Sequence, residues 1–317
     1  MESSALVELV DRFYRYEAGL SEGDVVVLAV SGGIDSMALA HASMQIAAGS
    51  RFQIAHFDHQ LRPDSRADRD LVREFASRAG VAFHSVAADV AGFAREEGLS
   101  IEEAARLLRY RHLDAVRRET GARCVAVAHH RDDQAETVLL RLIRGSGLRG
   151  LRAMRPVAGH IIRPLLRVGR EDIVRYHAAA GFEYREDPTN ALPAADRNRI
   201  RLGVLPALRD IRPGVDAVLA RTADIFDGEV EVLRWAAAEA LERCDPRDVQ
   251  GALEICRNPL AGLPPGVVRA VLRHIAEQRS GEFLPRADVD AAAAFCLETK
   301  SGGSIRLGRS LQVRRSA

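Results

Sequence analysis

Residues 25–36 read VVVLAVSGGIDS, an apolar run that passes directly into a glycine-containing loop and the start of a helical pattern. A continuous β-branched run is typical of a strand buried on both faces of a parallel sheet. The first N–H groups of the following helix lack partners and carry partial positive charge, and paired glycines let a phosphate approach them. The stretch therefore predicts an anion site, to which Ser31 and Ser36 add hydroxyl donors and Asp35 adds a carboxylate for Mg²⁺ or a proton. A tight strand-to-helix turn capped by Asp35 or Ser36 is the simpler alternative.

Strand and helix patterns alternate through the first part of the chain. Strand-like runs recur at 52–57, 82–86 and 124–128, and helical patterns at about 64–80 and 101–120 separate them. This alternation predicts right-handed crossovers and an α/β fold, with a doubly wound parallel sheet of the Rossmann-like type.

The character of the sequence changes after Pro213. Amphipathic helix patterns cover 215–243 and 265–279, and residues 304–313 alternate like a short hairpin. At roughly 100–200 residues per domain, a chain of 317 residues suggests two domains. We expect an α/β domain that carries the anion site at 1–210 and a smaller, mainly helical domain at 211–317.

Composition excludes several classes of protein. No run reaches the ~18 apolar residues of a membrane span, and the acidic residues among the first fifteen do not fit a secretory signal. We therefore expect a cytoplasmic protein with no membrane partner. The four cysteines are far apart and form no C-x-x-C pair, which argues against zinc, iron–sulfur and thioredoxin-type sites. The only lysine is Lys300, so the lysine that a Walker P-loop or a protein kinase needs is absent from the first 299 residues.

The loop Ser31-Gly32-Gly33-Ile34-Asp35-Ser36 resembles the SGGxDS signature of the PP-loop ATP pyrophosphatase superfamily. That superfamily includes GMP synthetase, asparagine synthetase, tRNA thiolases and tRNA(Ile)-lysidine synthetase. Its members release pyrophosphate from ATP and transfer AMP. The resemblance implies ATP and Mg²⁺ at this loop and leaves the acceptor of AMP open.

Further stretches, which follow one another in order over about two thirds of the chain, resemble tRNA(Ile)-lysidine synthetases. They are 56–62 (HFDHQLR), 103–110 (EAARLLRY), 129–148 (from HHRDDQAE to RGSGL), 163–166 (RPLL), 187–190 (DPTN) and 197–201 (RNRIR). The resemblance implies a ligase that adenylylates C2 of the wobble cytidine, position 34, in tRNA(Ile) with a CAU anticodon. Free L-lysine then displaces AMP through its ε-amine, which gives lysidine, AMP and pyrophosphate.

Three carboxylates fall together at the start of the helical pattern that follows residues 124–128. Asp132 and Asp133 precede Glu136 by four and three residues, so all three share one face of the first helical turns. Such a cluster suits Mg²⁺ and the ammonium of lysine, and it suits removal of the proton that the amine must lose before it attacks. A solvated acidic helix start beside His129 and His130 is the alternative.

Arginines supply the opposite charge. Arg106 and Arg109 are three residues apart and would lie on one helical face, able to reach the α-phosphate or the base. A surface ion pair with Glu102 or Glu103 is the alternative. Residues 127–201 hold fourteen arginines against nine acidic residues, in a chain whose net charge is +1, as a tRNA backbone would require.

The resemblance and the residue chemistry together assign roles. Catalysis is assigned to Asp35, Arg109, Asp133 and Glu136. ATP binding is assigned to Ser31, Gly32, Gly33, Ile34, Asp35, Ser36, His56, Arg106 and His129. Lysine binding is assigned to Asp132 and Glu136, and metal binding to Asp35 and Asp133. Binding of tRNA is assigned to Arg144, Arg149, Arg152, Arg197, Arg199 and Arg201.

Other members of the superfamily fit the sequence less well. Thiolases need a cysteine for sulfur transfer, and Cys124 sits alone in a strand pattern where core packing is expected. GMP and asparagine synthetases work with a glutamine-hydrolysing domain, whose nucleophilic cysteine we do not find. A catalytically silent RNA-binding protein is a different class of hypothesis, which a test of pyrophosphate release would separate. The expected partners are tRNA(Ile) and free L-lysine, and a homodimer is left open.

Overall fold

The protein forms two compact units in the computed structural model, which describes residues 3–46, 51–62, 64–186, 196–282, 284–298 and 302–315. The first unit ends at Ile225 and the second begins at Phe226, inside helix α11 (Val215–Glu242). This division lies later in the chain than the boundary predicted near residue 210. The DPTN stretch at 187–190 lies outside the described residues.

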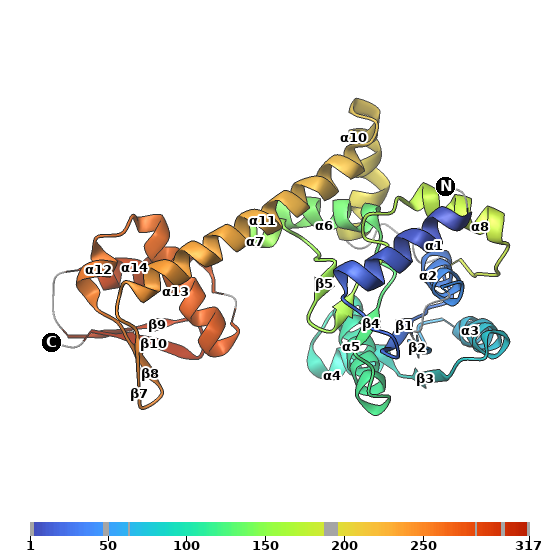
Figure 1. Ribbon diagram of the computed structural model, residues 1–317, viewed down its shortest axis with the longest axis horizontal. Coiled ribbons are helices and arrows are strands. Elements are labelled where there is room, and N and C mark those ends of the chain that lie inside the picture. Colours follow the sequence, from blue (N-terminus) through green and yellow to red (C-terminus); the bar gives the residue numbers. More distant parts are fainter. Residues whose placement is uncertain are drawn as a thin grey trace. The chain divides into compact units, whose positions relative to one another are not determined.

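A six-stranded sheet forms the centre of the first unit (Figure 1). Its strands are β1 (Val25–Ala29), β2 (Arg51–Asp58), β3 (Phe83–Ala87), β4 (Cys124–Ala126), β5 (Val157–Ala158) and β6 (Ile161–Ile162). They lie in the order β3-β2-β1-β4-β6-β5, and all neighbours are parallel except β5 and β6. The predicted α/β fold is confirmed. Strands β5 and β6 were not predicted, because they are too short to give a sequence pattern.

Helices precede, separate and follow these strands. They are α1 (Ser3–Arg12), α2 (Ile34–Met44), α3 (Ser65–Ala79), α4 (Val90–Glu97), α5 (Ile101–Glu119), α6 (Arg131–Ile143), α7 (Leu148–Leu151), α8 (Arg170–Ala180), α9 (Asp196–Arg199) and α10 (Leu205–Ile211), with π-helical turns at Phe13–Glu17 and Ile200–Val204. The helical patterns at 64–80 and 101–120 are confirmed as α3 and α5. The sequence patterns gave no prediction for α1 and α8.

Side chains of β1 alternate between two apolar cores. Val26 and Leu28 pack with residues of α1, α2 and α8, whereas Val27 packs with Val125 of β4 and Leu113 of α5. A strand buried on both sides must be apolar at every position, which is why this run shows no polar alternation. Helices therefore cover both faces, and the sheet is doubly wound.

The second unit contains the rest of α11 and a separate apolar core that includes Leu241, Leu272 and Val289. Its other helices are α12 (Arg257–Ala261), α13 (Pro265–Ser280) and α14 (Arg286–Leu297). Two hairpins complete it, β7 (Arg247–Val249) with β8 (Ala252–Glu254) and β9 (Ser304–Leu307) with β10 (Leu311–Arg314). The helical patterns and the 304–313 hairpin are confirmed. Within the described ranges, no helix combines the length and apolar composition needed to cross a membrane.

Candidate active site

A cavity of about 960 Å³ opens at the carboxyl ends of β1, β2 and β4. Its lining includes the loop after β1, residues 55–59 at the end of β2, and residues 127–130 after β4. The strand order reverses here, because β2 lies on one side of β1 and β4 lies on the other. Open α/β sheets bind ligands at such switch points. The fold thus brings the predicted phosphate loop and the acidic helix start to one cavity.

The phosphate loop, residues 31–36, is shaped by its own serines and glycines. Ser36 Oγ donates to the carbonyl oxygen of Gly33 at 2.9 Å and accepts from the N–H of Ser31 at 3.1 Å. Gly32 has φ +96°, a left-handed conformation that other residues rarely adopt, and Gly33 is the N-cap of α2. The start of α2 therefore offers unpaired amides at the cavity wall, as the predicted anion site requires.

His56 is a buried side chain of β2 that lines the same cavity. Its Nδ1 lies 2.8 Å from the carbonyl oxygen of Val30 and must carry the proton, because a carbonyl only accepts. Burial lowers the pKa of the imidazole, which keeps it neutral. Nε2 then holds a lone pair, and it finds no hydrogen-bond partner in the described part of the chain. This orphaned acceptor suits an amino group on a ligand.

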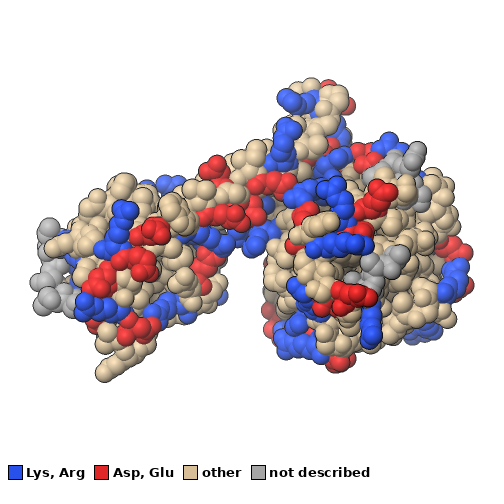
Figure 2. Space-filling model, viewed as in Figure 1, with Lys and Arg blue, Asp and Glu red and all other residues tan. Residues whose placement is uncertain are grey.

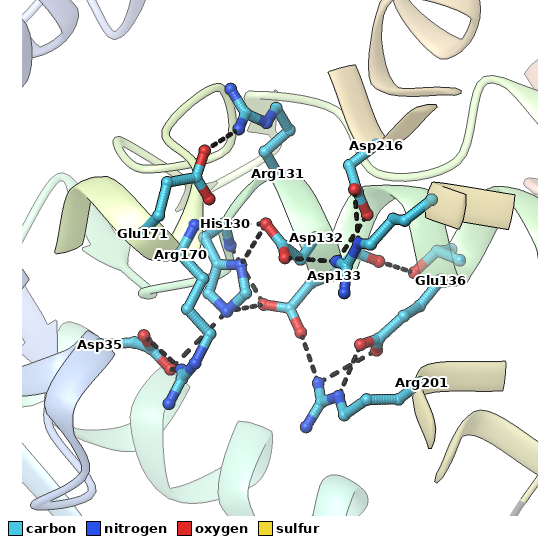
Figure 3. Close-up of polar contacts among 12 residues, drawn as sticks. Asp35, His130, Arg131, Asp132, Asp133, Glu136, Arg170, Glu171, Arg201 and Asp216 are labelled. Atoms are coloured by element: carbon cyan, nitrogen blue, oxygen red, sulfur yellow. Dashed lines mark hydrogen bonds and ion pairs between the residues drawn. The ribbon is translucent and has the colours of Figure 1, made fainter. Parts of the chain in front are cut away.

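His130 joins the phosphate loop to the acidic cluster (Figure 3). It is the buried N-cap residue of α6, and its backbone N–H donates to Oδ2 of Asp133 at 3.1 Å. Its Nε2 lies 3.7 Å from Oδ2 of Asp35 and 3.5 Å from Oδ2 of Asp133, and its Nδ1 lies 3.8 Å from Oδ1 of Asp132. The sequence pattern gave His130 no role of its own and placed it only beside the cluster. Its position between a strand and three carboxylates could have indicated a role in the site.

Arginines cover the buried part of the acidic cluster. Glu136, which is almost fully buried, accepts from Nε of Arg197 at 2.7 Å and from Nε of Arg201 at 2.5 Å. Asp133 Oδ1 accepts from Nη2 of the same two arginines at 3.0 and 3.2 Å. Burial by itself would raise the pKa of Asp133, but the charges of His130 and Arg197 hold it below its usual range. Arg197 and Arg201, which we assigned to tRNA, therefore contact the acidic cluster, and that assignment stays a prediction.

Two further arginines at the cavity were not predicted from the sequence. Arg170, the first residue of α8, places Nη1 2.8 Å from both carboxylate oxygens of Asp35, and its backbone N–H donates to Oδ1 of Asp132 at 3.2 Å. Arg209 of α10 donates to Oδ2 of Asp132 at 2.9 Å and to Oδ2 of Asp216 at 2.8 Å. The contacts of Arg170 with Asp35 and of Arg209 with Asp132 join residues far apart in the chain, so no local pattern indicated them.

The two arginines predicted to contact ATP from α5 differ in position. Arg109 lines the cavity, whereas Arg106 is not among the lining residues. The guanidinium carbon of Arg106 lies 4.9 Å, and that of Arg109 5.6 Å, from the ring centroid of Tyr110. Glu103, the alternative partner, instead forms a capping box with Ser100. The roles of both arginines stay predictions.

His129 and the predicted metal ligands also lie at the cavity. Burial lowers the pKa of His129, although Asp133 acts in the opposite sense, so the imidazole is neutral at physiological pH. Within the described ranges, no three His, Cys, Asp or Glu side chains form a metal-binding group. Asp35 and Asp133 nevertheless approach the same nitrogen of His130 with carboxylate oxygens. Mg²⁺ commonly takes one or two carboxylates and completes its shell with phosphate and water oxygens, so this pair fits an ion that arrives with a nucleotide.

The other arginines predicted to bind tRNA also make contacts within the protein itself. Arg144 and Arg199 are exposed, and they lie 3.4 and 3.9 Å from carboxylate oxygens of Asp196. Arg149 and Arg152 are half-buried and make contacts within the protein. Basic and acidic side chains are interspersed on the face shown in Figure 2. The arginine surplus of residues 127–201 is thus partly balanced by internal ion pairs.

Comparison with known proteins agrees with this geometry. A family model described as a PP-loop domain matches residues 6–208. Among solved structures, the U34-tRNA thiolase NcsA from Methanococcus maripaludis with its [4Fe-4S] cluster superimposes with a TM-score of 0.59. The match covers 71% of this chain and 78% of that chain at 18% identity, so it supports the fold alone.

Proteins with similar sequences identify the family to which this PP-loop domain belongs. The chain is 36% identical to the tRNA(Ile)-lysidine synthase of Geobacter sulfurreducens over 98% of its own length and 68% of that protein. It is 42% identical to a tRNA(Ile)-lysidine synthase of Thermus thermophilus over 82% of its own length and 50% of that protein. The chain thus spans between half and about two thirds of these two relatives. The resemblance seen in the motifs is confirmed, and the chain belongs to the tRNA(Ile)-lysidine synthase family of PP-loop, ATP-utilising ligases.

Proposed function

We propose that the protein forms a carbon–nitrogen bond between L-lysine and C2 of cytidine 34 in tRNA(Ile) with a CAU anticodon, at the expense of ATP. One observation supports this proposal most directly: the carboxylates of Asp35 and Asp133 both approach Nε2 of His130, at 3.7 and 3.5 Å. A phosphate loop alone would be compatible with any member of the superfamily that splits ATP. An acidic cluster at the same cavity adds a place for a cationic amine beside the activated base.

The first step is adenylylation of the base. The triphosphate of ATP rests on the first amides of α2, where Ser31 and Ser36 add hydroxyl groups. The cytosine O2 attacks the α-phosphorus, so that an O2–P bond forms, the bond to the bridging oxygen breaks, and pyrophosphate leaves. Arg109 at the cavity wall opposes the negative charge that grows during this transfer. Mg²⁺ held by Asp35 and Asp133 would neutralise charge on the phosphates.

The second step is displacement of AMP by lysine. The ε-nitrogen attacks C2, the C2–O2 bond breaks, and AMP leaves with that oxygen. The nitrogen must be neutral to attack, so a carboxylate of the acidic cluster takes its proton. Asp132 and Glu136 hold the ammonium before this transfer. Arg197 and Arg201 contact Glu136 in the structure, and we expect lysine to share this carboxylate with them.

The wider contacts follow from the same proposal. Exposed arginines such as Arg144 and Arg199 would contact the tRNA backbone, together with Arg306, Arg309 and Arg314 of the second unit. An enzyme that acts on tRNA is expected in the cytoplasm. A homodimer stays a prediction.

A labelled-lysine assay tests the proposal. The protein is incubated with ATP, Mg²⁺, labelled L-lysine and a tRNA(Ile) transcript with a CAU anticodon, and the digested nucleosides are separated. We expect the label in lysidine, together with equimolar AMP and pyrophosphate. A transcript with uridine at position 34 is the matched control and should stay unlabelled. Binding of tRNA without pyrophosphate release would contradict the proposal and favour a silent RNA-binding protein.

Two substitutions test the role assignments. Asp35→Ala and Glu136→Ala should each abolish lysine incorporation while the circular dichroism spectrum stays that of a folded protein. Asp35→Ala should also stop pyrophosphate release, because the first step fails. Turnover near that of the unmodified protein in either variant would contradict the role given to that residue.

A further inference from the structure

Asp35, the carboxylate of the phosphate loop, is already paired in the structure. Nη1 of Arg170 lies 2.8 Å from each of its two oxygens. The two residues come from different helices, α2 and α8, and both line the cavity (Figure 3). A cation that needs the Asp35 carboxylate must therefore compete with a guanidinium.

The backbone of Arg170 is fixed, but its side chain is not enclosed. The N–H of Arg170 donates to Oδ1 of Asp132, and the neighbouring Glu171 pairs with Nη2 of Arg131 on α6 at 2.5 Å. A Cβ added at the preceding Gly169 would meet the ends of the Arg131 and Glu171 side chains, which lie against the start of α8. The side chain of Arg170 is 47% exposed and that of Asp35 is 28% exposed. The start of α8 is thus anchored at the cavity, while the guanidinium on its flexible stem can change partners.

The pairing of Arg170 with Asp35 is easily exchanged. Ion pairs with partners this exposed contribute little, because water competes for both groups. A triphosphate is a better partner for a guanidinium than one carboxylate, since it carries more charge and offers several acceptor oxygens. The amides at the start of α2 would hold those phosphates within one helical turn of Asp35.

We propose that Arg170 is a positioning residue that exchanges partners: it neutralises Asp35 in the empty cavity and moves to the phosphates of ATP when the nucleotide binds. The move frees Asp35 for the divalent cation. Arg170 therefore opposes binding of the cation alone and favours binding of the nucleotide. Metal and nucleotide then bind with positive coupling, because each one removes the competitor of the other. This inference rests on the proposed function only in taking ATP with a divalent cation as the ligand.

The test measures two affinities in the variant Arg170→Gln. Mn²⁺ serves as the metal probe and is followed by electron paramagnetic resonance without nucleotide, and ATP binding without metal is followed by calorimetry. Because the exposed pair with Asp35 contributes little, we expect the Mn²⁺ affinity to rise by about two- to fivefold. The hydrogen bonds of a guanidinium to charged phosphates support a loss on the order of tenfold in the ATP affinity. Mn²⁺ should bind more tightly to the variant than to the unmodified protein, and ATP should bind more weakly. A purely structural role would move both affinities in the same direction.

Two further variants make the test specific. Arg175→Gln changes an arginine on the same helix that pairs with Asp172, and it should leave both affinities unchanged. Arg170→Lys keeps the charge and should restore part of the ATP affinity. An unchanged or weakened Mn²⁺ affinity in a folded Arg170→Gln protein overturns the inference. Lysidine formation by the unmodified protein is measured separately, so failure of the proposed function and failure of the partner exchange give different results.

Discussion

At the scale of single residues, the two glycines of the phosphate loop carry different constraints. Gly32 has φ +96°, and a Cβ there would lie 3.4 Å from Cβ of Asp68. Gly33 has φ −76°, and the nearest atom to an added Cβ is Oγ of Ser31 at 3.6 Å. Gly32→Ala should therefore destabilise the fold, by more than about 1 kcal/mol. Gly33→Ala should leave the fold intact and block the approach of a phosphate.

Thermal unfolding and ATP calorimetry separate these two effects. We expect a lower melting temperature for Gly32→Ala, and an unchanged melting temperature with lost ATP affinity for Gly33→Ala. Normal ATP affinity in the folded Gly33→Ala protein would contradict the placement of phosphate against the start of α2.

The charge of Asp133 sets a pH dependence. Its pKa is held below the usual range, so it binds a proton less readily in the folded than in the unfolded chain. The resulting stability is present above the unfolded pKa of about 3.9 and is lost as the pH falls through the folded value. Urea unfolding of Asp133→Asn between pH 6 and pH 2 should therefore show a shallower loss of stability than the unmodified protein. An equally steep loss would contradict this role, and Asp70→Asn, at an exposed site of α3, is the matched control.

At the scale of elements, Arg197 and Arg201 fasten α9 and the following π-helical turn to α6. Each contacts both Asp133 and Glu136, so either arginine alone still compensates the buried carboxylates. Each single substitution to Met should cost only about 1–2 kcal/mol of unfolding free energy. The double substitution removes both arginine partners of the buried carboxylates Asp133 and Glu136 and should cost about 3–5 kcal/mol.

A double-mutant cycle by urea unfolding at pH 7 measures the coupling between these arginines. The double variant should lose more stability than the two single variants together. Simple additivity of the two single losses would show that the arginines act independently.

Elements also show how far the sequence alone could go. The phosphate loop and the Asp132, Asp133 and Glu136 cluster are local patterns, because a strand end and one helical face define them. Contacts such as Arg170 with Asp35 depend on how α8 packs against α2. That packing rests on long-range contacts, including the 2.7 Å hydrogen bond between Nδ1 of His41 and the hydroxyl of Tyr176, which no local pattern reveals.

The prediction of tRNA-binding arginines was limited for the same reason, because it depends on how the elements pack. A count of charges along the chain cannot distinguish a guanidinium that faces solvent from one that faces a buried carboxylate. Arg197 and Arg199 are two residues apart, yet Arg197 contacts Glu136 and Arg199 is exposed on the surface. Which of the two faces solvent depends on which face of α9 packs against α6.

At the scale of the whole molecule, burial divides the four thiols. Cys124, Cys244 and Cys296 are buried, and Cys256 is exposed, so the core packing expected for Cys124 is confirmed. Burial raises the pKa of Cys124 to about 12 and also raises the pKa of Cys244 and Cys296. Thiols with raised pKa values hold little of the reactive thiolate.

Titration with a thiol-reactive disulfide reagent at pH 8 should therefore modify one equivalent of cysteine in the folded protein and four in denaturant. Cys256→Ser should abolish the rapid reaction, and Cys124→Ser should leave it unchanged. Rapid modification of two or more thiols before unfolding would contradict the burial of the other three.

The central place of β1 has a consequence for hydrogen exchange. This strand pairs with β2 on one side and with β4 on the other, so its amides meet solvent only when the sheet separates. Deuterium uptake at residues 26–29 should be among the slowest in the first unit and should follow global unfolding. The phosphate loop follows β1 directly, and we therefore expect partial opening elsewhere in the unit to leave the conformation of this loop unchanged.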